Sequence, residues 1–316
     1  MRESFSAEVV DLQNQAPNRN RRECKYYWDE LYTLINAAGF EYMEIPYQPK
    51  WDFGGRSGIP LTNRSVTTKF DTVGNYIDTL KGYGLKGLTG IHFDSTLFCG
   101  GHIDMYFGAM QHFAEEALQF AKEAGAEYFT MSVTPTWYAV HSLQPEGMSD
   151  EEFEQQFLAK NKEAIEHLAE VAEGLGIRLC LKNEYWTLLY GEKIVPYVES
   201  LKHKVSIDAD LAHLQIADTD VKRFVELNID KIGVVHITDT DFADGEEARK
   251  QVMPEAPASK PQKVLKDIGK GTVDIKAIYE VLKQKAYDGT VVYNCKDSYD
   301  PCRSLLRTRY FINHNL

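Results

Sequence analysis

Short apolar runs alternate along this chain with longer segments in which apolar residues recur every three or four positions. The runs have the length and the β-branched content of strands, and the longer segments have the period of amphipathic helices. The runs predict strands over residues 8–12, 40–46, 88–93, 127–133, 179–184, 205–210, 233–239 and 290–294. The segments predict helices over about residues 22–38, 68–82, 104–124, 149–175, 192–202, 219–228, 273–285 and 301–312. Eight strand–helix units in succession predict an α/β fold, a (β/α)8 TIM barrel, formed by a single domain over residues 1–316.

A doubly wound open sheet is the alternative architecture for this alternation. Such a sheet usually stops at five or six strands and has a glycine-rich first turn. Neither Gly-x-Gly-x-x-Gly nor the P-loop pattern Gly-x-x-x-x-Gly-Lys-Ser/Thr occurs in the sequence, so dinucleotide-binding and P-loop folds lose support. The closed barrel is therefore the predicted fold.

Three connections are longer than a barrel needs, over residues 47–67, 134–150 and 240–268. Each follows a predicted strand, so each would rise at the C-terminal face, where barrel enzymes have their active sites. There the long loops would form walls or a lid over the site. The 240–268 segment has an equally supported alternative, which is an inert or partner-binding insertion.

The charge balance restricts the partners of this protein. Its 316 residues include 47 acidic and 35 basic side chains, and the net charge of −12 argues against nucleic acid and favours a neutral or polar substrate or a metal ion. No apolar run approaches the ~18 residues of a membrane span, and the N-terminal residues lack the layout of a signal peptide. Five cysteines without a Cys-x-x-Cys pair indicate reduced thiols and a cytoplasmic setting.

Polar side chains able to bind a metal follow the later strands. Asp210 ends the sixth predicted strand and His213 follows it, while His236 and Asp239 stand at the end of the seventh. These side chains would converge, because the C-terminal ends of barrel strands meet at one face. Carboxylate and imidazole ligands suit Mn²⁺, Zn²⁺, Fe²⁺ or Co²⁺ better than Ca²⁺ or Mg²⁺. The alternatives are a packed histidine at His236, a substrate contact at His213, and an Asp239 that either orients His236 or caps the next segment.

The order and spacing of four short motifs resemble the xylose-isomerase-like barrels. This superfamily includes sugar epimerases, hydroxypyruvate isomerase, inosose isomerase and dehydratase, and endonuclease IV, and the resemblance covers roughly residues 25–312. The motifs are Ala38-Gly39-Phe40-x-Tyr42-Met43-Glu44-Ile45, Asp210-x-x-His213, Val234-Val235-His236-Ile237-x-Asp239 and Ile268-Gly269-Lys270-Gly271-x-Val273-Asp274. The acidic net charge argues against the endonuclease branch, which needs a basic groove and several zinc ligands.

This resemblance implies a divalent metal ion held between Glu, Asp, His and Glu side chains at the ends of strands five to eight. By position, Asp210 and His236 match two of these ligands, and His213 matches a histidine that contacts the substrate. The implied cofactor is Mn²⁺, with Mg²⁺, Zn²⁺ and Co²⁺ as alternatives.

Two positions depart from the family pattern. Lys182 stands where the strand-five glutamate is expected, and Glu184, two residues on and on the same strand face, is the nearest carboxylate that could serve as a ligand. Asn294 stands where the strand-eight glutamate is expected, and its amide oxygen could still bind a metal. Because the two glutamates are the bases of the epimerases, their replacement puts ordinary two-base epimerisation in doubt. Lys182 is either a base or an oxyanion-binding group, or it forms a salt bridge with Asp208 or Asp210.

Aromatic side chains are concentrated in the loops expected above the barrel mouth. Trp51, Trp137 and Trp186 are the candidate substrate-binding residues, with Tyr185 and Tyr190 beside the last of them. Aromatic faces pack against the C–H faces of sugars and against flat aglycones. No Lys and Arg cluster suited to a phosphate is evident near strands seven and eight. We therefore expect a small-molecule substrate that is an unphosphorylated sugar, a keto-sugar or a glycoside.

The long loops, the aromatic rim and the altered acid–base residues resemble one branch of the superfamily, the metal-bearing subunits of C-glycoside deglycosidases. These proteins act on 3-oxo-glucosides and pair with a small β-sandwich subunit, which implies a hetero-oligomer. The implied reaction is removal of the C2 proton of a metal-bound keto-sugar, followed by loss of the C1 aglycone by β-elimination. The candidate bases are His141, His213, Lys182 and Glu184.

Two other functions stay open. One is a sugar isomerase or epimerase that acts on a keto-sugar or an inosose. The other is a non-catalytic barrel subunit with a degenerate metal site, which would explain Lys182 and Asn294. The enzyme functions share one requirement, which is abstraction of a proton next to a carbonyl group.

Overall fold

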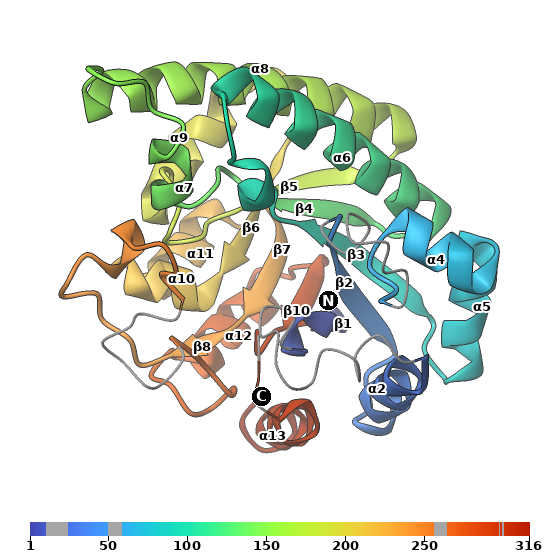
Figure 1. Cartoon of the computed structure of the whole chain (residues 1–316). Helices are drawn as coiled ribbons and strands as arrows, with labels where there is room; N and C mark the ends of the chain where they lie inside the picture. Colours follow the sequence, from blue (N-terminus) through green and yellow to red (C-terminus); the bar gives the residue numbers. More distant parts are fainter. Residues whose placement is uncertain (11–24, 50–58, 256–263, 297, 299) are drawn as a thin grey trace.

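The computed structural model describes residues 1–10, 25–49, 59–255, 264–296, 298 and 300–316. The fold class is the predicted one. Within these ranges, eight parallel strands close into a barrel in the order β1-β10-β7-β6-β5-β4-β3-β2 (Figure 1). The barrel strands are β1 (Arg2–Ser6), β2 (Tyr42–Tyr47), β3 (Gly87–Phe93), β4 (Tyr128–Ser132), β5 (Arg178–Lys182), β6 (Ser206–Asp210), β7 (Ile232–Ile237) and β10 (Thr290–Tyr293).

Helices surround the barrel and connect successive strands (Figure 1). The α-helices are α2 (Lys25–Ala37), α4 (Asn63–Phe70), α5 (Val73–Gly82), α6 (Ile103–Glu123), α7 (Trp137–His141), α8 (Asp150–Leu175), α9 (Ile194–Glu199), α10 (Leu211–Ile216), α11 (Val221–Asn228), α12 (Ile275–Gln284) and α13 (Pro301–Asn315). Short 3₁₀ turns are η1 (Ala7–Val9), η2 (Ser95–Phe98), η3 (Gly191–Lys193) and η4 (Ala248–Lys250). None of the described helices combines the length and the apolar character needed to cross a bilayer.

Ser149 caps the N-terminus of α8. Ser149 Oγ accepts a hydrogen bond from the backbone N–H of Glu152, which satisfies one of the free donors at the helix N-terminus. Acidic side chains in the first turn add a favourable interaction with the helix dipole.

The first strand lies earlier than the sequence pattern predicts. The expected strand over 8–12 is wrong for its described part, because Glu8 belongs to the 3₁₀ turn η1 and the strand is β1; residues 11 and 12 lie outside the described residues. The reason is that β1 is partly polar. Ser4 Oγ bonds Thr89 Oγ1 at 2.8 Å inside the barrel, so the strand lacks the apolar run that would reveal it.

The predicted helix over 68–82 is two helices, α4 and α5. The break falls at Asp71, which has a positive φ of 67° and ends α4. Thr72 then begins α5, because its Oγ1 accepts the backbone N–H of Asn75 at 3.1 Å. Apolar residues keep a helical spacing across this break, so periodicity alone predicts one helix.

Inside the barrel, charged and polar side chains are mixed with apolar ones. Tyr128 Oη donates to Glu44 Oε2 at 2.7 Å, and Thr130 Oγ1 donates to Asp208 Oδ2 at 2.6 Å. These groups are fully buried. Burying a polar group is unfavourable unless it is hydrogen-bonded. These hydrogen bonds therefore stabilise the buried carboxylates of Glu44 and Asp208 inside the barrel.

The long segment after β7 begins and ends in a small antiparallel ribbon of β8 (Asp239–Thr240) and β9 (Leu265–Lys266). Asp239 Oδ2 accepts the backbone N–H groups of Gly269 at 2.9 Å and Gly271 at 2.8 Å. Asp239 therefore caps the segment that follows the ribbon, which is one of the two roles expected for it. A Cβ atom at Gly271 would lie 2.2 Å from Asp239 Oδ1, so this close approach requires glycine.

Candidate active site at the C-terminal face of the barrel

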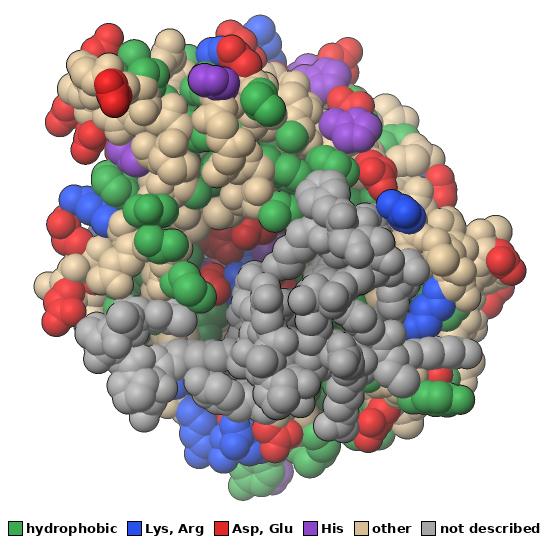
Figure 2. Space-filling model, viewed as in Figure 1, with side chains coloured by type: hydrophobic (Ala, Val, Ile, Leu, Met, Phe, Trp, Pro, Cys, Tyr) green, Lys and Arg blue, Asp and Glu red, His purple; other side chains and the backbone are tan. Residues whose placement is uncertain are grey.

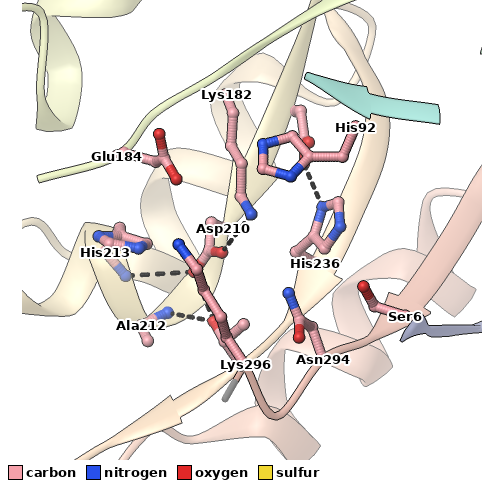
Figure 3. A network of polar contacts seen from close by, with 12 residues as sticks. Ser6, His92, Lys182, Glu184, Asp210, Ala212, His213, His236, Asn294 and Lys296 are labelled. Carbon is pink, nitrogen blue, oxygen red and sulfur yellow. Dashed lines mark hydrogen bonds and ion pairs between the residues drawn. The ribbon is translucent and has the colours of Figure 1, made fainter. Parts of the chain in front are cut away.

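Charged side chains from neighbouring strands meet at the C-terminal end of the barrel (Figure 3). Lys182 is the last residue of β5, Asp210 is the last of β6, His236 is near the end of β7 and Asn294 follows β10. The strand register sets Lys182 beside Asp208 and Asp210 beside His236. In the space-filling view, acidic, basic and histidine side chains lie at the bottom of a hollow in this face (Figure 2). The parallel strands thus bring these predicted residues together.

Lys182 is a buried cation. Its Nζ lies 3.4 Å from Asp210 Oδ2, and its side chain is 2% exposed. Burial alone would lower the pKa of the amine, but the carboxylates of Asp210, Glu8, Glu184 and Asp208 raise it well above its ordinary value. The salt bridge with Asp210 is one of the roles expected for Lys182. As an ammonium ion, Lys182 can donate hydrogen bonds but cannot remove a proton.

Asp210 is ionised, and both of its carboxylate oxygens have protein partners. Its Oδ1 accepts from Thr238 Oγ1 at 2.5 Å and from the backbone N–H of His213 at 3.3 Å. Burial would raise the pKa of this carboxyl, but His213, Lys182 and His236 lower it to about 2. Asp210 therefore stays a carboxylate at any physiological pH.

His236 is held between two carboxylates inside the barrel. Its Nδ1 lies 2.6 Å from Asp208 Oδ1, and its Nε2 lies 3.0 Å from Glu44 Oε1. Burial would lower the pKa of the ring, but Asp208 and Glu44 raise it to about 10. Both ring nitrogens therefore carry protons and donate. Asp208, rather than Asp239, orients this ring.

A third group joins η1, β3 and the residue after β10, and sequence reasoning missed two of its members, Glu8 and His92. Glu8 Oε1 lies 3.1 Å from His92 Nδ1, and Asn294 Nδ2 donates to Glu8 Oε2 at 2.8 Å. Burial opposes both charges, yet the pairing lowers the pKa of Glu8 well below its usual value and raises the pKa of His92. Only closure of the barrel brings these distant residues together, so no local signal marks Glu8 and His92 as partners of Asn294.

Glu184, His213 and Glu255 form a cluster at the mouth of the site. One ligand atom from each lies within 4.8 Å of the others, so the three could hold a metal ion. Both carboxylates already have protein partners. Glu184 Oε2 accepts from Ser132 Oγ, and Glu255 Oε1 lies 2.7 Å from Lys296 Nζ. Glu255 comes from the 240–268 segment, which thereby reaches the site.

The tautomer of His213 follows from its surroundings. Its Nδ1 accepts the backbone N–H of Tyr185 at 3.1 Å, so the neutral ring carries its proton on Nε2. A metal bound through Nε2 would need that nitrogen unprotonated. The arrangement therefore favours hydrogen-bond donation by His213 over ligation.

Three buried polar atoms near the site have no hydrogen-bond partner among the residues that the structure describes. They are Asn294 Oδ1, His92 Nε2 and Trp186 Nε1. Unpaired buried polar groups are rare in proteins and call for a polar partner such as a bound ligand. Asn294 and His92 are both at least nine-tenths buried, at 1% and 3% exposure.

Two of the predicted site residues lie together on α7. His141 stacks on Trp137 with ring centroids 3.7 Å apart, and its Nδ1 lies 2.9 Å from the Trp137 carbonyl oxygen. Its Nε2 is 3.4 Å from Glu154 of α8, which also accepts from Trp137 Nε1 at 3.2 Å. The contacts found for His141 thus lie on α7 and α8. Lys182 and His213, in contrast, both contact Asp210. Trp51 lies outside the described residues.

Residues 242–249 of the 240–268 segment pack on the loop after β5. Phe242 lies against Trp186 at 6.4 Å between ring centroids, and Tyr185 Oη donates to Asp244 Oδ2 at 3.0 Å. The guanidinium of Arg249 lies 4.9 Å from the Tyr190 ring centroid. The described part of the segment thus lies against the loop that carries Tyr185 and Trp186, and its role as a wall of the site stays a prediction.

The divalent ion implied by the family resemblance does not fit the residues at strands five to eight. Such an ion would bind Asp210 at about 2.0–2.2 Å, but the ammonium group of Lys182 already lies 3.4 Å from Oδ2. A histidine ligand must offer an unprotonated nitrogen, whereas His236 directs both nitrogens to carboxylates. Asn294 donates from Nδ2 to Glu8, so only its Oδ1 stays available as a ligand atom. Lys182, Asp210 and His236 belong to a network of protein ion pairs instead.

Known proteins share the fold of this chain. Residues 32–307 match the family model described as a xylose isomerase-like TIM barrel. No curated protein matches the chain significantly. The probable 3-DHS dehydratase AsbF from Bacillus anthracis aligns over 100% of both chains with a TM-score of 0.69 and 13% identity. At this identity, the likeness establishes the fold.

Two further solved structures are similar to the chain. The 3-keto-D-glucoside 4-epimerase YcjR from E. coli covers 98% of this chain and 97% of its own length, with a TM-score of 0.63 and 19% identity. The IOLI protein, whose structure holds a zinc atom, covers 99% and 97%, with a TM-score of 0.64 and 13% identity. Metal binding and sugar chemistry therefore occur among proteins with this fold.

Proposed function

Since this chain belongs to the xylose isomerase-like TIM barrel family, we propose that it is an enzyme that moves a proton next to the carbonyl group of a sugar or keto-sugar. The observation that carries the proposal is the position of Lys182, a buried cation, beside Glu184 and His213 at the C-terminal end of the barrel (Figure 3). These three side chains supply the positive charge, the base and the proton donor that such a reaction needs.

Lys182 is the group that stabilises the charge formed in the reaction. Removal of a proton next to a carbonyl places negative charge on the carbonyl oxygen. A fixed cation in a buried site stabilises that charge more strongly than water does, because the local dielectric constant is low and the group is already oriented. The carboxylates around Lys182 keep it protonated for this role.

Glu184 and His213 form the acid–base pair in this proposal. Glu184 takes the proton from the carbon, and the electrons of the broken C–H bond form the C=C bond of an enolate. His213 donates from Nε2 to a substrate oxygen, as its tautomer allows. In an isomerisation, the old carbonyl carbon receives the proton and its oxygen becomes a hydroxyl, while the hydroxyl on the carbon that lost the proton gives up its own proton and becomes the new carbonyl. In an epimerisation, a donor on the opposite face protonates the carbon that lost the proton.

The same enolate leads to a lyase when a leaving group stands on the adjacent carbon. In a 3-oxo-glucoside, loss of the C2 proton gives an enolate. The C3 carbonyl then re-forms as the C1=C2 bond forms, and the C1–aglycone bond breaks with its electron pair on the aglycone, which takes a proton. We propose this C-glycoside deglycosylation as the specific reaction, because aromatic side chains from the β5 loop and the 240–268 segment stand beside the site.

The unpaired buried atoms support a hydroxyl-rich substrate. Asn294 Oδ1 is an acceptor, Trp186 Nε1 is a donor, and His92 Nε2 can be either. A sugar offers hydroxyl groups that both donate and accept, so it can satisfy all three. The nearby lysines are already paired with carboxylates, Lys182 with Asp210 and Lys296 with Glu255, which favours a substrate without a phosphate group.

Exchange of solvent deuterium into the substrate tests the proposal. A panel of unphosphorylated ketoses and 3-oxo-glucosides is incubated with the protein in D₂O, and the C–H signals next to the carbonyl are followed by NMR. We expect exchange into at least one compound. Lys182→Met and Glu184→Gln should each lower its rate roughly 10²- to 10³-fold. Release of aglycone identifies a lyase, whereas a new sugar isomer identifies an isomerase or epimerase.

Matched variants on the outside of the barrel serve as controls. Lys276→Met and Glu280→Gln make the same chemical changes at exposed positions of α12 and should leave the exchange rate unchanged. No exchange into any member of the panel would contradict the proposal and favour the non-catalytic barrel. Equal loss in the active-site and control variants would also contradict it.

A further inference from the structure

We infer that Lys182 is the electrophile of this barrel and that the site is independent of metal. The ammonium group of Lys182 takes the place of a divalent ion beside Asp210. The catalytic part of this inference rests on the proposed function. The structural part, in which Lys182 excludes a divalent ion from Asp210, does not depend on any substrate.

The hydrogen bonds of Asp210 leave little room for a metal. Its Oδ1 is used by Thr238 and by the backbone N–H of His213. Its Oδ2 faces Lys182 Nζ at 3.4 Å. An ion bound to Oδ2 at about 2.0–2.2 Å would lie within about 6 Å of the ammonium group. Two like charges at that distance in a buried site repel strongly.

The next strand offers no compensating ligand. His236 uses both of its ring nitrogens, one toward Asp208 and the other toward Glu44. Freeing one nitrogen would leave a buried carboxylate without its partner, which is strongly unfavourable. The ring is fully buried, so water cannot replace the lost hydrogen bond. Binding of a metal would therefore have to break ion pairs on two strands at once.

Lys182 also balances the carboxylates that surround it. Asp210, Glu8, Glu184 and Asp208 all act on its charge. If the ammonium group were removed, these side chains would form a cluster of carboxylates without their central cation. Oxygen ligands of this kind attract divalent ions such as Mn²⁺. At Asp210 the exclusion of metal is thus attributed to Lys182, and a change at this side chain should admit an ion that takes its other ligands from these carboxylates instead of from His236.

Metal analysis and Mn²⁺ titration test the inference without any substrate. The wild-type protein, purified without added metal, should hold far less than one equivalent of divalent metal, and EDTA should leave its deuterium exchange unchanged. Lys182→Glu should bind one Mn²⁺, seen by calorimetry and by broadening of the Mn²⁺ EPR signal. The double variant Lys182→Glu with Asp210→Asn should lose at least about tenfold of that affinity, which equals about 1.4 kcal/mol.

Charge reversal on the surface is the matched control. Lys276→Glu on α12 changes the net charge equally and should not create a Mn²⁺ site. Stoichiometric metal in the wild-type protein that disappears in Asp210→Asn would overturn the inference. Metal that disappears in Glu255→Gln, together with loss of exchange in EDTA, would overturn it as well, because the cluster at the mouth would then supply the electrophile.

The outcomes separate this inference from the proposed function. If the Mn²⁺ titration behaves as expected but no compound exchanges deuterium, the proposed function fails and the exclusion of metal by Lys182 stands. If exchange occurs but requires a metal, the proposed reaction stands and the inference fails. Circular dichroism shows whether Lys182→Glu folds. If it does not fold, the metal content of the wild-type protein and the response of its deuterium exchange to EDTA still test whether the site is independent of metal.

Discussion

His236 Nε2 lies 3.0 Å from Glu44 Oε1, although 192 positions separate the two residues in the chain. The opposite ring nitrogen is 2.6 Å from Asp208 Oδ1. All three side chains are fully buried. The histidine that the family pattern assigns to a metal is therefore the centre of an ion-pair network that joins β2, β6 and β7 across the barrel.

The stability of the protein should fall at alkaline pH because of this network. Asp208 and Glu44 raise the pKa of His236 from 6.5 to about 10, against the effect of burial. A group whose pKa is raised by folding contributes stability that is complete below its unfolded pKa. That contribution is lost as the pH rises from about 6.5 through about 10.

Urea unfolding at several pH values measures this contribution. We expect the free energy of unfolding of the wild-type protein to decrease between pH 7 and pH 10, at a limit of ~1.4 kcal/mol per pH unit for this one group. His236→Gln should be less stable at pH 7 and should show a flatter dependence over this window. Parallel pH profiles for the two proteins would show that His236 is not charged in the folded state.

Lys182 and Asp210 should be coupled in stability. Replacing one member of a buried ion pair leaves the other uncompensated, so Lys182→Met or Asp210→Asn should each cost roughly 3–5 kcal/mol. The double variant should cost clearly less than the two single costs added together. A double-mutant cycle from denaturant unfolding gives the coupling energy. Additive costs would contradict the direct pairing of these side chains.

The ion pair between Glu255 and Lys296 should matter for substrate binding more than for stability. The pair is partly exposed, with side-chain exposures of 29% and 16%, so its loss should cost no more than about 1 kcal/mol of folding free energy. Glu255→Gln should raise the KM of the exchange reaction several-fold, because Glu255 lies in the cluster with Glu184 and His213. An unchanged KM with a large loss of stability would assign Glu255 a structural role only.

Gly271 should tolerate no side chain. A Cβ atom there would lie 2.2 Å from Asp239 Oδ1 and 2.5 Å from the backbone of Thr240. Gly271→Ala should therefore destabilise the protein by about 1–3 kcal/mol through overpacking. Gly108→Ala in α6 is the control, since nothing lies within 4 Å of its Cβ position. That change should be neutral or stabilising by up to about 1 kcal/mol, because alanine is the better helix former. Thermal unfolding compares the two.

The sequence by itself determined the architecture and which strand-end side chains meet at its C-terminal face. Alternating strand and helix periods predict the barrel, and parallel strands bring their C-terminal residues together without any further information. Lys182, Asp210 and His236 could therefore be selected as site residues from their positions after apolar runs. The exceptions were local. The polar strand β1 and the break at Asp71 were missed because neither changes the hydrophobic pattern in a recognisable way.

Only the tertiary structure decided what these side chains do. The sequence shows Asp210 and His236 at strand ends but not that Lys182 faces the first, or that Glu44 and Asp208 flank the second. Charge states depend on which groups lie within a few ångströms in a buried site, and closure of the barrel sets those distances. The residues whose pattern in the sequence resembles a metal site form an ion-pair network in the fold, and Lys182 is one of its cations.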